Sequence, residues 1–240
     1  MKFGVIVPST NTVVQPEYDA MRPYGVTNHF ARIHIPNDPV HDDADFNKLM
    51  DGIRAATMAA VDRIVTCEPG YLVFGMSAET FWDGLEGSKL LEQNVRARGK
   101  LDVALGSDAC QAALKAYGGI NRIAVVTPYM PVGDANVVKF FTDCGFEVVR
   151  VKGLRCASPT LIAHVTQAEL RDAILEVDGP EVDAIVQVGT NLAMARLAGF
   201  AEFWLGKPVL AINTATYWYA LRQNGIADRV EGFGRLLTEF

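Results

Sequence analysis

The sequence predicts an α/β protein built as two pseudo-symmetric lobes, each a parallel sheet flanked by helices. Half of the 240 residues are apolar and 21% are charged, which supplies enough apolar side chains for a large core. Unbroken apolar runs alternate with helical periodicities, a pattern typical of parallel sheets covered on both faces. The runs predicted as strands are 3–7, 71–74, 101–105, 122–126, 146–151, 183–188 and 208–212.

Helix signals lie between these runs. Apolar residues recur at three- and four-residue spacing from Phe46 to Ile64, which predicts an amphipathic helix. Thr166 precedes Glu169 by three residues, the capping-box pattern, so we expect a helix to begin there. The stretch IPNDPVHDD (35–43) is predicted to be a loop that covers the site discussed below.

The chain repeats itself loosely and in the same order. The three matches pair an N-terminal with a C-terminal segment. They predict lobes at 1–118 and 119–240, with the last helix packing back on the first lobe. The matched pairs are FGVIVPSTN (3–11) with IAVVTPYMP (123–131), YLVFGMS (71–77) with DAIVQVGTN (183–191), and LGSDACQAALKAYG (105–118) with INTATYWYALRQNG (212–225).

Neutral polar groups follow four of the predicted strands. Ligands of open α/β sheets bind beyond the carboxyl ends of strands, and two facing lobes would bring these four turns to one cleft. We expect helices to begin at 75–77 and 189–191, where free N–H groups favour carboxylates. The sequence thus predicts a site for a small organic anion, formed by Ser9, Thr10, Asn11, Gly75, Met76, Ser77, Tyr129, Gly189, Thr190 and Asn191.

The same residues have simpler interpretations. Ser, Thr and Asn after a strand are common helix caps, and Tyr129 can be a core aromatic whose hydroxyl binds a carbonyl. The arrangement of four such turns in register between two repeats favours the site. Within it, Ser77 and Tyr129 are the best hydrogen-bond donors for an oxyanion, with Thr190 and Asn191 on the opposite wall.

Two segments, GVIVPSTNTVVQPE and RIAVVTPYMPVGDANVVKFFTDCGFEVV, carry a family resemblance that extends through nearly the whole chain. They resemble the Asp/Glu racemase superfamily, in particular its branch of arylmalonate decarboxylases and maleate cis–trans isomerases. The resemblance implies two pseudo-symmetric lobes, a site between them, and chemistry without a metal or an organic cofactor.

The resemblance also bears on single residues. Racemases and isomerases of the superfamily use one cysteine from each lobe, and the corresponding positions are Gly75 and Gly189 here. Decarboxylases keep only the second cysteine, and Met76 stands where they have a threonine. Asn11 and Tyr129 match binding residues of the branch. The asparagine of the isomerases is replaced within Ser158–Thr160. We expect Gly189→Cys to fold, because relatives carry cysteine at this strand end.

Without the two thiols, proton transfer needs another group. Glu79 follows the first turn and is either a catalytic acid or base or a solvated cap of the next helix. Cys110 is the one thiol in the first turn of a helix near a strand end, where its pKa could be lowered. The residues with catalytic roles are therefore predicted to be Ser77, Tyr129 and Glu79.

Charge and composition limit the other functions. A net charge of −6 argues against a nucleic-acid surface, and no apolar run is long enough to span a membrane. The acidic stretch HDDAD (41–45) lacks the spacing of a metal site, so no metal is predicted. Nothing indicates export, which favours the cytoplasm and four reduced thiols. The sequence leaves homo-oligomer formation open.

The function predicted is that of a cofactor-independent enzyme acting on a small carboxylate or dicarboxylate through an oxyanion-stabilised, enolate-like intermediate. A decarboxylase or another lyase is favoured. The alternatives are a cis–trans isomerase, a hydrolytic enzyme, or a small-anion-binding protein without catalysis.

Overall fold

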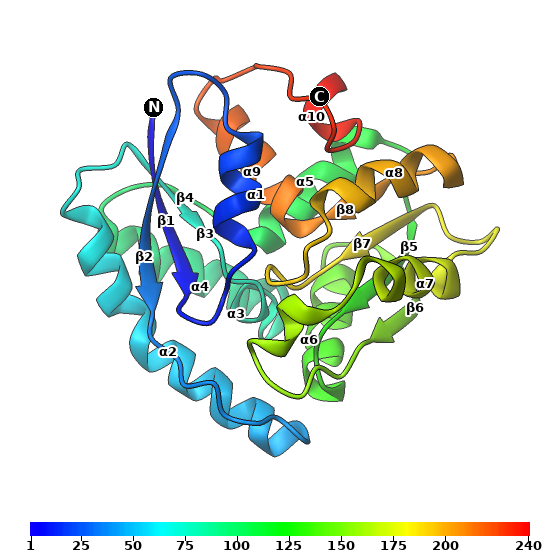
Figure 1. Cartoon of the computed structure of the whole chain (residues 1–240), viewed down its shortest axis with the longest axis horizontal. Helices are drawn as coiled ribbons and strands as arrows, with labels where there is room; N and C mark the ends of the chain where they lie inside the picture. Colours follow the sequence, from blue (N-terminus) through cyan, green and yellow to red (C-terminus); the bar gives the residue numbers. More distant parts are fainter.

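The computed structural model describes residues 1–240 and contains two four-stranded parallel sheets, each with the same strand order (Figure 1). The first sheet has the order β2-β1-β3-β4. Its strands and helices are β1 (Lys2–Pro8), α1 (Val14–Met21), β2 (Thr27–Ile33), α2 (Asp43–Val65), β3 (Tyr71–Phe74), α3 (Ala78–Phe81), α4 (Gly84–Gly99), β4 (Val103–Ala104) and α5 (Gly106–Tyr117).

The second sheet has the order β6-β5-β7-β8, so β5 and β7 occupy the places of β1 and β3. This equivalence confirms the α/β class and the pseudo-symmetry of the two lobes. The elements are β5 (Arg122–Thr127), α6 (Pro131–Asp143), β6 (Glu147–Gly153), the 3-10 helix η1 (Leu161–His164), α7 (Gln167–Val177), β7 (Ala184–Gln187), α8 (Ala195–Leu205), β8 (Val209–Ala211), α9 (Ile212–Gln223) and α10 (Leu236–Glu239).

The central strands are buried on both faces, as unbroken apolar runs require. β1 is buried from its second residue to its last, and β3 and β7 are buried throughout. Each of the seven predicted strands coincides with a strand of the structure. β4 is shorter than predicted, because only Val103 and Ala104 pair with β3.

One strand, β2, was not predicted from the sequence. Its sequence TNHFARI has polar residues at most positions, and most of its side chains are only partly buried. It pairs with β1 alone, along its whole length from Thr27 to Ile33. Because an edge strand packs less fully than a central one, it lacks the apolar run that identified the others.

The acidic residues of HDDAD organise the start of α2. Asp42 is the N-cap, and its carboxylate accepts from the backbone N–H of Asp45. Asp43 reaches the other lobe, where it accepts from the backbone N–H of Val132 in α6. At α7 the predicted capping box is present, with Thr166 and Glu169 each bonding the other's backbone N–H.

α9 connects the two halves of the chain. It follows β8 directly, yet it packs against α5 and against β3 and β4 of the first sheet. Its burial is almost complete around the helix, since nine of its twelve residues are buried. The exact lobe boundary near residue 118 stays a prediction.

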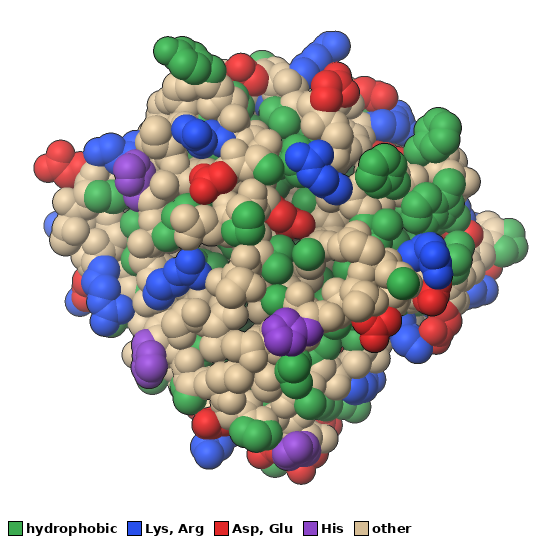
Figure 2. Space-filling view, in the orientation of Figure 1, with side chains coloured by type: hydrophobic (Ala, Val, Ile, Leu, Met, Phe, Trp, Pro, Cys, Tyr) green, Lys and Arg blue, Asp and Glu red, His purple; other side chains and the backbone are tan.

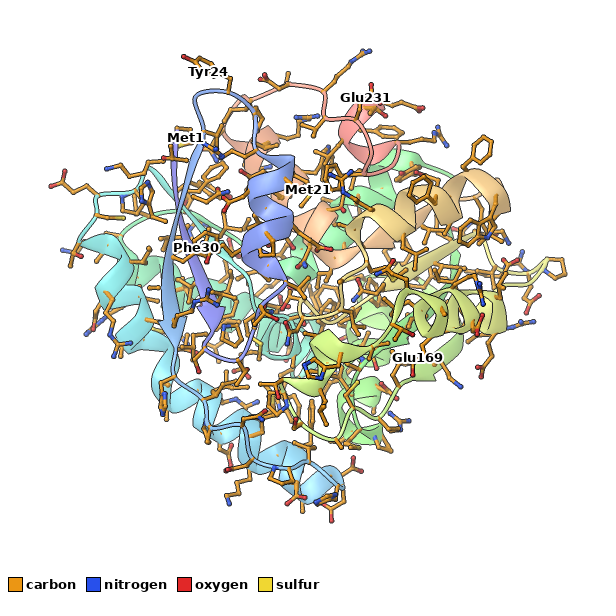
Figure 3. The ribbon with its side chains drawn as sticks, viewed as in Figure 1. Met1, Met21, Tyr24, Phe30, Glu169 and Glu231 are labelled. Carbon is orange, nitrogen blue, oxygen red and sulfur yellow. The ribbon has the colours of Figure 1, made fainter.

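The surface carries one group of large apolar side chains. Phe200, Phe203 and Trp204 of α8 are 66%, 90% and 43% exposed, and Figure 2 shows apolar side chains gathered over this helix. In Figure 3, Tyr24 points outward from the loop after α1, whereas Met21 at the end of that helix is buried. No helix has both the length and the hydropathy of a membrane span. Homo-oligomer formation stays a prediction.

Candidate functional site

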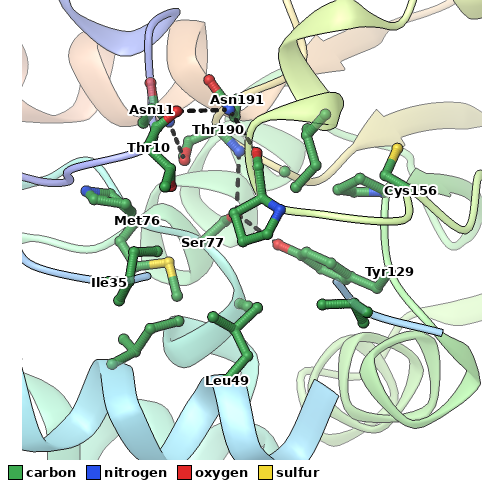
Figure 4. Close-up of a pocket in the computed structure, with 18 of the residues that line it drawn as sticks. Thr10, Asn11, Ile35, Leu49, Met76, Ser77, Tyr129, Cys156, Thr190 and Asn191 are labelled. Carbon is green, nitrogen blue, oxygen red and sulfur yellow. Dashed lines mark hydrogen bonds between the residues drawn. The ribbon is translucent and has the colours of Figure 1, made fainter. Parts of the chain in front are cut away.

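A pocket lies where the carboxyl ends of β1, β3, β5 and β7 meet between the lobes (Figure 4). It lies between the lobes because each sheet contributes the turns that follow its two central strands, as the repeat predicts. The lining residues are Pro8, Thr10, Asn11, Ile35, Val40, Phe46, Leu49, Met50, Ile53, Met76, Ser77, Ala78, Pro128, Tyr129, Cys156, Ser158, Pro159, Ile162, Gly189, Thr190 and Asn191.

Most of the predicted site residues line this pocket, and three do not. The exceptions are Ser9, Gly75 and Glu79. The lining contains no Lys, Arg, His, Asp or Glu, so every polar group in it is formally neutral. A carboxylate bound here would be held by neutral hydrogen-bond donors, which act strongly where water is excluded.

Ser77 and Tyr129 meet across the lobes at the centre of the pocket. The Ser77 Oγ lies 2.5 Å from the Tyr129 hydroxyl, and both residues are buried. The backbone N–H of Thr190 donates to the same Ser77 Oγ at 3.1 Å. The two hydroxyl groups have two protons between them and use one in their mutual bond. One O–H therefore stays available to a ligand oxygen.

The Tyr129 turn is fixed by a buried acid. The Thr127 hydroxyl donates to Asp134 and accepts from the backbone N–H of Tyr129 at 3.1 Å. Arg155 donates to both Asp134 and the Tyr129 carbonyl. Burial raises the pKa of the Tyr129 phenol. The phenol is therefore protonated at neutral pH and acts as a hydrogen-bond donor.

The amide and hydroxyl groups of the PSTN and GTN turns bond mainly to one another. The Asn11 Oδ1 accepts from the N–H groups of Val13 and Val14 where α1 begins, and its Nδ2 donates to the Thr190 hydroxyl at 3.3 Å. Asn191 accepts from the N–H of Thr12 at 3.0 Å. Asn11 therefore both binds the backbone at the start of α1 and lines the pocket. These bonds link the two lobes at the pocket wall.

Contrary to what the sequence led us to expect, the turns after β3 (75–77) and β7 (189–191) do not begin long helices. After β3 the helix is only the four-residue α3, which begins at Ala78. After β7 the chain continues without helix until Ala195. The N–H of Thr190 instead points to Ser77. The anion site therefore depends on side-chain hydroxyls more than on a helix N-terminus.

The two glycines at the strand ends differ in what surrounds them. A Cβ on Gly75 would lie 3.0 Å from Val14 Cγ1, within the packing of the first lobe, so it would not enter the pocket. Gly189 lines the pocket, but its φ is +115° and a Cβ would lie 2.5 Å from Pro128 Cδ. This corrects the expectation that Gly189→Cys is readily tolerated, because both backbone and neighbour oppose a side chain.

Glu79 and Ser9 lie outside the pocket, which corrects their predicted placement. The Glu79 carboxylate accepts from Arg54 Nε at 2.9 and 3.1 Å. Glu79 is therefore held in an ion pair with Arg54 outside the pocket. Arg54 also lies over the Trp82 ring, 5.0 Å from its centroid. The Ser9 hydroxyl bonds the backbone of Ile35, which fixes the start of the loop above the pocket.

The structure also changes the interpretation of two cysteines, Cys110 and Cys156. Cys110 is fully buried, and burial raises the pKa of its thiol, whereas the sequence suggested that it could be lowered. Cys156 lines the pocket and is half-buried, with its pKa raised to about 11 by desolvation. No sequence signal indicated it, because the loop after β6 has no periodicity. A protonated thiol, and not a thiolate, therefore faces the pocket at neutral pH.

The other end of the pocket is apolar. α2 provides one wall of it with residues that the sequence assigned to the core, because helical periodicity does not separate a core face from a pocket wall. The loop 35–43 lines the pocket as predicted, through Ile35 and Val40. The α2 residues are Phe46, Leu49, Met50 and Ile53, and Ile162 of η1 lies with them.

Comparisons with known proteins agree with this geometry. Maleate isomerase of Pseudomonas putida is 26% identical over 248 residues, covering 99% of this chain and 97% of that protein. The structure of Nocardia farcinica maleate cis-trans isomerase, a mutant with a covalently bound succinylcysteine intermediate, has a TM-score of 0.90 and 25% identity, covering 100% of this chain and 98% of that one.

A structure of arylmalonate decarboxylase shares the fold, with a TM-score of 0.80 and 20% identity over 99% of both chains. The family model described as arylmalonate decarboxylase matches residues 3–237. The match covers both lobes and the whole pocket, and it confirms the resemblance noted in the sequence. The chain belongs to the arylmalonate decarboxylase family.

Proposed function

We propose that this protein is a cofactor-independent enzyme that decarboxylates a small malonate-type dicarboxylate with an apolar substituent. The observation that carries the proposal is the Ser77–Tyr129 pair, whose hydroxyls lie 2.5 Å apart across the lobes and whose Ser77 Oγ also accepts from the Thr190 N–H. Donors held in this way stabilise an oxyanion without having to reorganise during the reaction.

The reaction assigns a role to each end of the pocket. One carboxylate of the substrate binds at the hydroxyl pair, and the other lies toward the apolar end, where it is poorly solvated. The bond from the α-carbon to this second carboxylate breaks and CO₂ leaves. Its electron pair enters the remaining carboxylate as an enediolate, one oxygen of which accepts the O–H that the Ser77–Tyr129 pair leaves available. A proton supplied by solvent water then adds to the α-carbon, which gives the monocarboxylate product.

Isomerisation of maleate is the second candidate, and the maleate isomerase relatives favour it. Against it, Gly75 and Gly189 provide no thiol at the two strand ends, and Cys156 has a raised pKa of about 11. A thiol that is protonated at neutral pH is a poor nucleophile for addition to a double bond. Decarboxylation needs no such addition, so we favour it.

A substrate panel separates these functions. Purified protein is incubated with phenylmalonate, methylmalonate and maleate, and the release of CO₂ and the formation of fumarate are measured. We expect CO₂ from at least one malonate, no fumarate, and loss of turnover in Tyr129→Phe. Fumarate formation would establish the isomerase instead. Binding of a malonate without any turnover would show an anion-binding protein.

A further inference from the structure

A carboxylate outside the pocket bonds to the turn that forms its wall. Glu17 of α1 is half-buried as a residue, but both of its carboxylate oxygens accept hydrogen bonds from the second half of the chain. Its Oε1 accepts from the N–H of Ala195 at the start of α8, at 3.0 Å. Its Oε2 accepts from Nδ2 of Asn213 in α9, at 2.6 Å. Glu17 thus joins three helices.

Asn213 connects Glu17 to Thr190, which lines the pocket. It is 2% exposed, and the same Nδ2 that bonds Glu17 also donates to the carbonyl of Thr190 at 2.9 Å. Its Oδ1 has no partner. A flipped amide would place this oxygen against the Glu17 carboxylate and the Thr190 carbonyl, which are both acceptors. The Glu17 carboxylate and the Thr190 carbonyl together therefore fix the orientation of the Asn213 amide.

The turn that Asn213 holds positions the oxyanion donors. The N–H of Thr190 donates to Ser77 Oγ, and the Thr190 hydroxyl donates to the Gly75 carbonyl at 3.1 Å. We propose that Glu17 is a positioning residue for the Ser77–Tyr129 site and acts through Asn213 and the Thr190 backbone. Neither Glu17 nor Asn213 lines the pocket, so their effect on a ligand passes through these bonds.

The burial of the Glu17 carboxylate is expected to make the Ser77–Tyr129 site sensitive to pH. Burial raises the pKa of Glu17 to about 7, although the bonds from Asn213 and Ala195 and the charge of Arg196 in α8 act in the opposite direction. Its neighbour Tyr18 and, beyond it, Cys110 of α5 are neutral near this pH because burial raises the pKa of both. Protonation of Glu17 below pH 7 converts one carboxylate oxygen to a hydroxyl and removes the negative charge, which weakens the bonds from Ala195 and Asn213.

The first test requires no ligand. The backbone amide signals of Ala195 and Thr190 are followed by NMR from pH 5 to 9 in the intact protein. We expect both to titrate with a midpoint near 7. In Glu17→Gln both titrations disappear. In Asn213→Ala the Ala195 signal still titrates and the Thr190 signal does not, which keeps the test valid if Glu17→Gln fails to fold.

Glu202 of α8 provides the control. It is 5% exposed and accepts from the Tyr117 hydroxyl at 2.7 Å and from the N–H of Arg235 at 2.8 Å. Like Glu17, it thus has one side-chain donor and one backbone donor, and it does not line the pocket. Glu202→Gln should leave the Thr190 titration unchanged. A Thr190 signal that does not titrate in the unaltered protein, or that still titrates in Glu17→Gln or Asn213→Ala, would overturn the inference.

The second test rests on the proposed function and uses phenylmalonate as the probe. We expect Glu17→Gln to lower kcat/KM roughly tenfold, the effect of about one hydrogen bond, and to remove the inflection near pH 7. Glu202→Gln should keep the inflection. An unaltered inflection in Glu17→Gln would contradict the inference. If the unaltered protein neither binds nor converts phenylmalonate, the proposed function fails, while the NMR titration still decides the role of Glu17.

Discussion

At the scale of single residues, the proposed reaction depends on the hydroxyl groups of Ser77 and Tyr129. Ser77→Ala and Tyr129→Phe each remove one donor without adding volume, so we expect kcat to fall roughly 100-fold in each. The melting temperature should change little in Tyr129→Phe, which loses one hydrogen bond, and should fall further in Ser77→Ala, which also leaves the Thr190 N–H without its acceptor. Steady-state kinetics and calorimetry measure the two effects separately.

The buried pair Ser88–Ser107 is the control for this prediction. Its hydroxyls lie 2.7 Å apart and neither lines the pocket. Ser107→Ala loses one such bond, so it should lower stability about as much as Tyr129→Phe does and leave kcat unchanged. If Ser77→Ala behaves like Ser107→Ala, the Ser77 hydroxyl has a structural role alone.

Gly189 illustrates what the sequence could not predict. The repeat placed this glycine at a strand end facing the cleft, but the sequence did not reveal its φ of +115° or its contact with Pro128. We expect Gly189→Ala to destabilise the protein by about 3 kcal/mol, through backbone strain and the close contact together. Chemical denaturation measures this change.

The variant Gly206→Ala separates the cost of backbone strain from the cost of the contact with Pro128. The φ of Gly206 is +66° and a Cβ there meets nothing within 4 Å. Gly206→Ala should therefore cost about 1 kcal/mol, from backbone conformation alone. Equal costs at both positions would mean that Pro128 yields readily to a side chain at Gly189.

The thiol of Cys156 gives a prediction on chemical modification. Its pKa of about 11 predicts slow alkylation by iodoacetamide at pH 7 and faster alkylation, with loss of activity, as the pH rises toward 11. Cys144 has a similar pKa of about 11 and lies outside the pocket. Cys156→Ser should prevent inactivation and Cys144→Ser should not. Inactivation that persists in Cys156→Ser would place the sensitive thiol elsewhere.

At the scale of elements, the sequence predicted the central strands well and the edges poorly. β1, β3, β5 and β7 are unbroken apolar runs because both of their faces are buried, and the polar turns after them meet at the pocket. β2 escaped prediction because one of its edges is unpaired and its residues are mixed. The periodicity of α2 predicted the helix but did not distinguish its pocket wall from its core face.

The α2 wall is expected to set substrate size. Leu49 lines the apolar end and is only partly buried, so Leu49→Phe should extend into the pocket. We expect it to weaken binding of phenylmalonate roughly tenfold more than binding of malonate, because overpacking opposes the larger group. Leu90→Phe, at an exposed site on α4, is the control. Isothermal titration of both ligands makes the comparison, and equal weakening of the two would show that α2 does not contact the substituent.

At the scale of the whole molecule, the two lobes act as halves of one site. Ser77 and Asn11 come from the first lobe, and Tyr129, Thr190 and Asn191 come from the second. The internal repeat predicted this convergence from sequence, since corresponding strand ends of two facing sheets must meet. The contact through Glu17 and Asn213 could not be predicted, because it joins residues 196 positions apart that carry no common motif.

A crystal structure with bound phenylmalonate, determined for Tyr129→Phe so that turnover is slow, shows directly whether a substrate carboxylate binds at the hydroxyl pair. We expect one carboxylate within hydrogen-bonding distance of Ser77 Oγ and the phenyl group among the α2 residues Leu49, Met50 and Ile53. A carboxylate bound away from Ser77, for example at Arg54 beside Glu79, would contradict this expectation.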